Sequence, residues 1–127
     1  MVLADTSVWI RALRGLQPYE QEMNRLLNRR MVAGHAFVYG ELLIGDRGGR
    51  AHLLSLYERI RQSSLVPHEE VVALARARLL IGRGAGWIDI HLLASAIADR
   101  LALWTVDARL AILASELGVA YTFPRVH

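Results

Sequence analysis

The chain has 127 residues, of which 54% are hydrophobic and 21% are charged, and its formal net charge at pH 7 is +3. This length suits one compact domain, and the apolar share is sufficient for a core, so we expect residues 1–127 to form a single folded domain. The chain has no cysteine, which excludes disulfides, thiolate zinc sites and cysteine nucleophiles.

The predicted elements alternate between strands and helices along the chain. Short apolar runs predict strands over residues 2–5, 31–34, 65–67, 101–107 and 119–123. Helical periodicity and boundary residues predict helices over residues 7–14, 18–30, 35–45, 51–64, 69–82, 87–100 and 108–118. Strands separated by helices predict an α/β fold, in which helices cover both faces of a parallel sheet.

Two acidic residues stand at the ends of predicted strands. Asp5 ends the first strand, and Asp107 ends the strand LALWTVD, in which Thr105 shares the strand face of Asp107. In open α/β sheets, ligands bind beyond the carboxyl ends of the strands. Each Asp is equally suited to cap the helix that follows it, so neither residue by itself predicts a site.

Two further acids lie within apolar helices. Asp89 shares a helical stripe with Leu92, Leu93, Ala96 and Ile97, so its carboxylate points toward the core. The helix dipole stabilises an acid in the first turn by less than about 1 kcal/mol, which is below the usual free-energy cost of desolvating an unpaired carboxylate. The Asp89 carboxylate therefore needs a cation partner or an open cleft. Glu41 lies within the apolar helix HAFVYGELLIG, so it is either at the rim of the core or directed at a site.

The four acids together predict a metal site. A sheet wound as predicted brings their carboxylates into one cleft, where like charges cannot all ionise at low cost. A divalent cation resolves this conflict, and a set of oxygen ligands suits Mg²⁺ or Mn²⁺ better than zinc. Such a metal activates water and stabilises a pentavalent phosphorus centre.

Four segments, LADTSVWI, YGELLIG, GWIDIHLLASA and LWTVDARL, occur in this order along the chain. In this combination the chain resembles the PIN-domain ribonucleases, and within them the VapC-type toxins of bacterial toxin–antitoxin modules, over essentially its whole length. The resemblance implies a PIN-like three-layer α/β/α sandwich with a central parallel β-sheet. It also places the acidic quartet of the family on Asp5, Glu41, Asp89 and Asp107.

The resemblance assigns roles to individual residues of this site. In the family the quartet surrounds Mg²⁺ or Mn²⁺, and Asp5 and Asp89 match its most regular direct ligands. Three residues match positions that hydrogen-bond the carboxylates: Thr6 or Ser7, and Thr105. Some relatives carry another acid two residues after the last Asp, where this chain has Arg109, so a second metal would be less well supplied.

The activity and partners that the resemblance implies are those of a toxin. It implies RNA hydrolysis by in-line attack of metal-bound water, a homodimer, and a cognate antitoxin that covers the site in a higher assembly. DNA would be reached only through the antitoxin. The alternative is a non-catalytic PIN-like module that binds RNA or protein. Two other α/β classes also place acids at strand ends, the receiver domains and the haloacid-dehalogenase-like phosphotransferases. Both normally use a lysine, and this chain has none, which argues against them.

The charge distribution agrees with an RNA substrate. All fifteen basic residues are arginine, and setting the quartet aside leaves them against eight acids, which suits an anionic pocket on a cationic body. Five arginines are candidate phosphate contacts: Arg11, Arg14, Arg76, Arg78 and Arg83. Each of them could also be an ordinary solvated surface residue. The first apolar run is interrupted by charges and no segment resembles a membrane span, so we expect a cytoplasmic protein without membrane contact.

Overall fold

The structure is a computed structural model, and it describes residues 1–123. Its centre is a parallel sheet of three strands in the order β2-β1-β3. The strands are β1 (Val2–Ala4), β2 (Val32–Ala33) and β3 (Ala102–Trp104). Within the described residues the helices are α1 (Thr6–Leu13), α2 (Tyr19–Asn28), α3 (Ala36–Ile44), α4 (Ala51–Arg59), α5 (His68–Ala77), α6 (Trp87–Asp99) and α7 (Ala108–Glu116).

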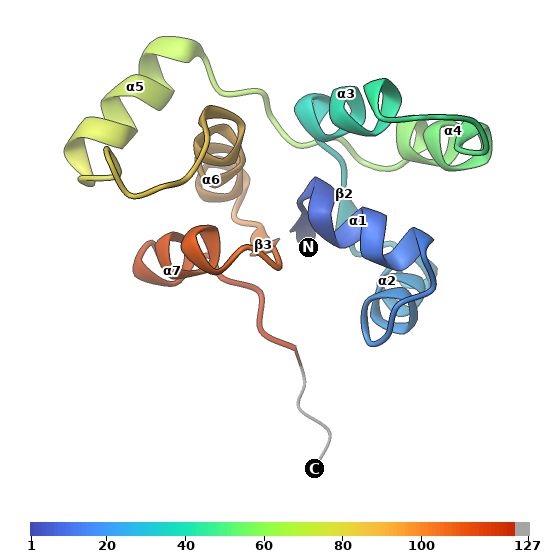
Figure 1. Ribbon diagram of the computed structural model, residues 1–127. Helices are drawn as coiled ribbons and strands as arrows, with labels where there is room; N and C mark the ends of the chain where they lie inside the picture. Colours follow the sequence, from blue (N-terminus) through green and yellow to red (C-terminus); the bar gives the residue numbers. More distant parts are fainter. Residues whose placement is uncertain (124–127) are drawn as a thin grey trace.

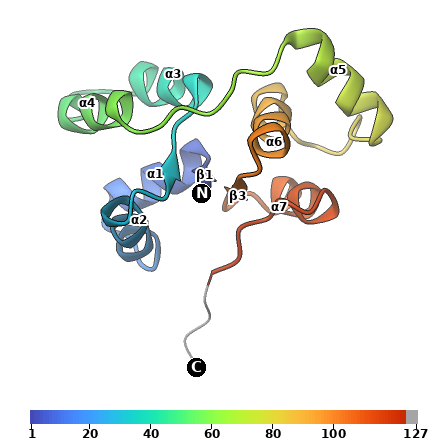
Figure 2. The ribbon, with the colours of Figure 1, turned by 180° about the vertical axis from the view of Figure 1, so that it is seen from behind.

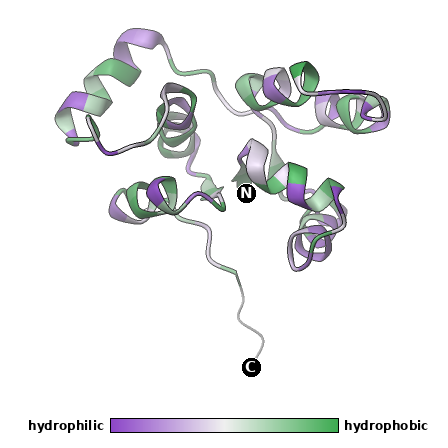
Figure 3. Cartoon of the chain, viewed as in Figure 1, coloured by the Kyte–Doolittle hydropathy of each residue, from purple (hydrophilic) through white to green (hydrophobic). Residues whose placement is uncertain are grey.

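The helices lie on both sides of the short strands. Helices α1 to α4 lie on one side and α5 to α7 on the other, as seen from the front and from behind (Figures 1 and 2). Most helices alternate hydrophobic and hydrophilic residues along their length, as amphipathic helices do (Figure 3). This arrangement confirms the predicted α/β class with a parallel sheet between helical layers.

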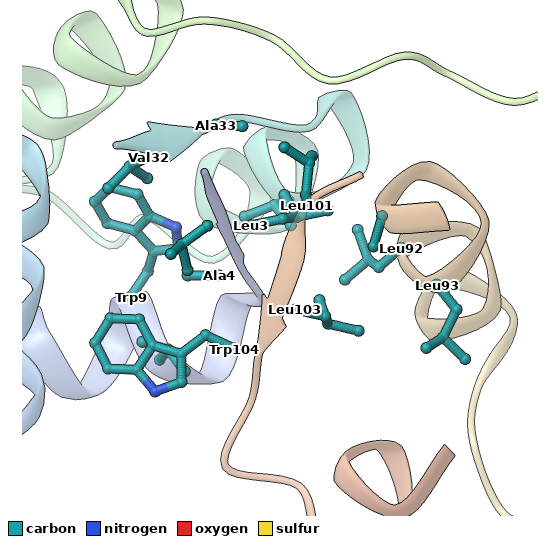
Figure 4. Packing of buried hydrophobic residues seen from close by; sticks show 14 of the residues in the cluster. Leu3, Ala4, Trp9, Val32, Ala33, Leu92, Leu93, Leu101, Leu103 and Trp104 are labelled. Atoms are coloured by element: carbon teal, nitrogen blue, oxygen red, sulfur yellow. The ribbon is translucent and has the colours of Figure 1, made fainter. Parts of the chain in front are cut away.

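The sheet is buried on both faces because its side chains alternate between them. Leu3 lies opposite Leu103 in the strand register, and both side chains point to the face covered by α6, where Leu92 lies (Figure 4). The other face carries Ala4 and Trp104, which are neighbours in the register, and Trp9 of α1 packs there. All of these side chains are buried. Since α1 and α6 share this core, the ends of the strands between them are held in fixed positions.

The predicted helix over residues 51–64 is too long, and the predicted strand over 65–67 is wrong. Helix α4 ends at Arg59, and the chain then passes along the sheet edge, where Gln62 forms a single parallel bridge with Gly34. This close approach favours glycine, because a Cβ at Gly34 would lie 2.6 Å from Nε2 of Gln62 and 2.9 Å from Cε1 of the buried Tyr57. The chain therefore pairs with the sheet edge at Gln62, before the apolar run over residues 65–67 that predicted a strand.

The last predicted strand, over residues 119–123, is reduced to one bridge between Leu103 and Ala120. The predicted helix over 69–82 ends at Ala77, since Leu79 has a left-handed backbone with φ of 56°. The strand predicted over 101–107 ends at Trp104, because Asp107 already caps α7. Of the five predicted strands, three are confirmed in shortened form, the last is reduced to a single bridge, and the one over 65–67 is wrong.

Candidate active site

Asp5 follows β1 directly and is the N-cap residue of α1. Its backbone N–H donates to the carbonyl of Trp104 at 2.9 Å, which ties the end of β1 to β3. Its side chain is only 6% exposed and accepts hydrogen bonds from the backbone N–H of Val8 at 3.1 Å and from the hydroxyls of Ser7 and Thr105. The capping interpretation is confirmed, and the same carboxylate lies at the edge where the strands end.

Asp107 repeats this arrangement at the start of α7. Its Oδ1 accepts hydrogen bonds from the N–H groups of Arg109 at 2.8 Å and Leu110 at 3.3 Å. Its own N–H donates to Oγ1 of Thr105 at 3.0 Å, while the Thr105 hydroxyl donates to Asp5. Thr105 therefore connects the two strand-end acids and sets their spacing.

The two helical acids come from opposite sides of the sheet. Asp89 lies in the first turn of α6, and its Oδ2 accepts a hydrogen bond from the N–H of Gly86 at 3.2 Å. Glu41 is exposed on α3, and its Oε1 accepts a hydrogen bond from the Thr6 hydroxyl at 2.7 Å. The two neighbouring hydroxyls therefore bind different acids: Ser7 donates a hydrogen bond to Asp5, and Thr6 donates one to Glu41.

The pKa values of the carboxyl groups show that the four acids share one electrostatic environment. Burial is the largest cause that raises the pKa of Asp89; the hydrogen bond from Gly86 opposes it, and the charges of Asp5, Asp107 and Glu41 raise it further. Burial likewise raises the pKa of Asp5 against its three hydrogen bonds, and the charge of Asp107 adds to the rise. Each of the other three predicted acids therefore acts on Asp89, and no basic side chain is among the groups that shift either pKa.

The donor set fits a hard divalent cation. Within residues 1–123, one carboxylate oxygen each of Glu41, Asp89 and Asp107 receives no hydrogen bond from a protein donor. The described residues contain no group of three acidic or histidine side chains already arranged as a ligand cage. The structure therefore supplies unbalanced negative charge and open carboxylate oxygens, the ligand chemistry that Mg²⁺ and Mn²⁺ prefer.

The predicted arginines lie outside this cluster. The Arg11 guanidinium lies over the Tyr19 ring, 5.4 Å from its centroid, and Arg14 is exposed at the end of α1. Arg76 and Arg78 are exposed at the end of α5, and Arg83 pairs with Glu116 at 2.7 Å. None of the five donates a hydrogen bond to the four acids.

The contact between Gly84 and Arg109 is predicted by no local pattern of the sequence. A Cβ at Gly84 would lie 2.7 Å from Cδ of Arg109, so the loop before α6 passes directly against this side chain. The glycine-rich segment GRGAG, residues 82–86, is typical of a close backbone approach, but Arg109 lies 25 residues after Gly84 along the chain. The contact brings the loop before α6 against the first turn of α7, two residues after Asp107.

The sequence of residues 2–116 matches the PIN domain family, and the chain belongs to this family. More particularly, it is similar to Ribonuclease VapC32 of Mycobacterium tuberculosis, strains CDC 1551 / Oshkosh and ATCC 25618 / H37Rv, with 39% identity over 121 residues that cover 94% of this chain and 95% of that protein. The crystal structure of PAE2754 from Pyrobaculum aerophilum has the same fold, with a TM-score of 0.56 and 18% identity, over 87% of this chain and 82% of that one. The predicted resemblance and fold class are confirmed.

Proposed function

We propose that this chain is a metal-dependent endoribonuclease and the toxin of a toxin–antitoxin module, built as one PIN domain, in which the acidic quartet holds Mg²⁺ or Mn²⁺. Membership of the PIN family and the similarity to Ribonuclease VapC32 support this activity. The observation that carries the site assignment is that acids from separate parts of the chain act on one another: burial first, and then the charges of Asp5, Asp107 and Glu41, raise the pKa of Asp89, and no basic side chain is among the causes of this shift.

The bound metal would supply Lewis acidity to the phosphate and activation of the attacking water. The chain itself holds the carboxylates in position for that task. Ser7, Thr105 and the N–H of Val8 leave Asp5 little rotational freedom, and Thr6 restrains Glu41. Metal and protons compete for these groups, since burial raises the pKa of Asp5, so we expect metal affinity to fall in acid.

The proposed partners are an RNA substrate, a second copy of the chain in a homodimer, and a cognate antitoxin in a higher assembly, all in the cytoplasm. Large apolar side chains at the surface support a protein partner: Ile44 is 88% exposed, and Leu79 and Ile81 are also exposed. Within residues 1–123, no helix is long and apolar enough to cross a bilayer. DNA contact would come only through the antitoxin.

The proposed RNA contacts remain the five predicted arginines. Arg11, Arg14, Arg76 and Arg78 are exposed, and residues 1–123 contain no carboxylate within ion-pair distance of them. Arg83 is paired with an exposed glutamate, Glu116, so RNA phosphate would compete for it at low cost. Exposed positive charge at these positions would attract a polyanion toward an otherwise repulsive acidic site.

The test is metal-dependent cleavage of total cellular RNA by the purified chain and by Asp5→Asn. Asparagine caps a helix as well as aspartate does, so we expect the fold to remain while cleavage in Mn²⁺ falls by about 100-fold or more. Asp46→Asn is the matched control, because it removes the same charge from a loop acid that bonds only the N–H of Gly48. Undiminished cleavage by Asp5→Asn would contradict the proposed site.

A further inference from the structure

We propose that Arg109 binds a phosphate group of the substrate RNA beside the acidic quartet, and that Gly84 positions its side chain to do so. The proposal deepens the ribonuclease function proposed above and rests on it. Arg109 is the second residue of α7, and its N–H donates to Oδ1 of Asp107 at 2.8 Å. Its backbone is therefore fixed to one of the four acids, while its side chain is exposed.

The Arg109 side chain is confined by the loop that precedes α6. A Cβ on Gly84 would lie 2.7 Å from its Cδ, 3.1 Å from its Nε and 3.0 Å from its Nη1, so any larger residue would displace the arginine. Gly84 also has a φ of 88°, which favours glycine. The contact therefore restricts the arginine along most of its length, from its stem to its guanidinium.

The loop that confines Arg109 is itself fastened at two points. The N–H of Gly86 donates to Oδ2 of Asp89 at 3.2 Å, and Arg83 pairs with Glu116 of α7 at 2.7 Å. Figure 1 shows this connection between α5 and α6 on the same side of the molecule as α7. One loop thus contacts the acid of α6 and the arginine that follows the acid of α7, which places Arg109 at the rim of the cluster.

The charge of Arg109 has no partner in the described part of the chain. The two ion pairs found in residues 1–123 join Arg25 to Glu22 and Arg83 to Glu116. A cation in the first turn of a helix opposes the helix dipole, and α7 is the one described helix whose first three residues include an arginine. Arg109 therefore holds an unneutralised charge in a position that disfavours it.

A phosphate group is the ligand that these features fit best. A guanidinium presents a planar fork of donors that matches two phosphate oxygens, and restriction before binding lowers the entropy lost on contact. The substrate of the proposed reaction must bring a phosphate to the acids, so the neighbouring phosphates of the same strand pass this rim. Arg109 supplies a positive charge there to bind them.

The experiment measures binding of a fluorescently labelled pool of random single-stranded RNA in EDTA, so that no cleavage occurs, over a series of salt concentrations. We expect Arg109→Gln to weaken binding about 10-fold and to lower the slope of log affinity against log salt by about 0.7, the value for one lost phosphate contact on a single strand. Arg47→Gln is the control, since it removes the same charge from an exposed residue of the loop after α3.

Gly84→Ala tests the positioning role without removing the charge. It should weaken RNA binding in the same direction, and the double variant with Arg109→Gln should bind no worse than Arg109→Gln alone. Additive losses would overturn the role of Gly84, and an unchanged salt slope for Arg109→Gln would overturn the phosphate contact. If the unaltered chain neither binds this RNA nor cleaves RNA in Mn²⁺, the proposed function itself fails. Cleavage by the unaltered chain with no effect of Arg109→Gln overturns only the present inference.

Discussion

Replacing Asp89 by asparagine should remove most of the stabilisation that a divalent metal gives this chain. The Asn side chain keeps an oxygen that can accept the 3.2 Å hydrogen bond from the N–H of Gly86, so the local structure of α6 is preserved. It removes one of four mutually repelling charges. Without metal, we therefore expect the melting temperature of Asp89→Asn to equal or exceed that of the unaltered chain.

The size of the effect follows from mass action. Metal at about 100 times its Kd stabilises the folded chain by about 2.7 kcal/mol. For 127 residues the entropy of unfolding is about 270 cal/mol/K, so the melting temperature should rise by about 10 °C. If the lost ligand weakens metal binding about 100-fold, the same metal concentration stabilises the variant by only about 0.4 kcal/mol, or about 1.5 °C.

The assay is thermal unfolding at neutral pH in EDTA and in a Mn²⁺ series at constant ionic strength. Asp46→Asn controls for the loss of a charge away from the cluster, and it should retain the full metal shift. An equal metal shift in Asp89→Asn and the unaltered chain would refute the reasoning. The absence of a shift in the unaltered chain would refute it as well.

The same cluster determines how the metal-free chain responds to pH. The pKa values of Asp5 and Asp89 are raised above 3.8 in the folded state, so the folded chain retains protons that the unfolded chain has already lost. The contribution of these two carboxyl groups to stability should therefore fall as pH rises from about 4 through the raised pKa values, and this loss is absent below that range. In EDTA, Asp89→Asn should show a smaller loss of melting temperature over this window.

Burial lowers the pKa of His35 to about 4, so the unfolded chain takes up a proton at this residue before the folded chain does. The contribution of His35 to stability should therefore fall by up to about 3 kcal/mol as pH falls from 6.5 toward 4. His35→Asn should lessen that loss in acid unfolding measurements. Thr105→Val removes a hydroxyl that bonds Asp5, and we expect a stability loss of about 1–3 kcal/mol by thermal unfolding and about 10-fold slower RNA cleavage; unchanged values would contradict its role. Tyr57→Phe leaves the buried N–H of His35, now bonded at 2.8 Å, without an acceptor, and should lower the unfolding free energy by about 1–3 kcal/mol. Tyr39→Phe, which loses only an exposed bond, should change stability little.

The local features of this chain were readable from its sequence because they depend on near neighbours. The alternation of strands and helices follows from apolar periodicity, and the caps at Asp5 and Asp107 follow from residue type before a helix. Asp89 stood out because an acid on an apolar stripe demands an explanation. In the structure its neighbours on that stripe, Leu92 and Leu93, are buried, whereas Ile97 is 37% exposed, since the stripe passes beyond the core near the end of α6.

The tertiary structure decided what depends on contacts between distant segments. The sheet edge pairs at Gln62 rather than at residues 65–67, because Gly34 leaves room for it, and no local pattern encodes that fit. Thr6 binds Glu41 while Ser7 binds Asp5 because α1 packs against α3, which brings Oε1 of Glu41 within 2.7 Å of Oγ1 of Thr6. Composition could supply four acids and a surplus of arginine, but only folding could bring the acids close enough to act on one another, since the chain separation between the first and last acid is 102 residues.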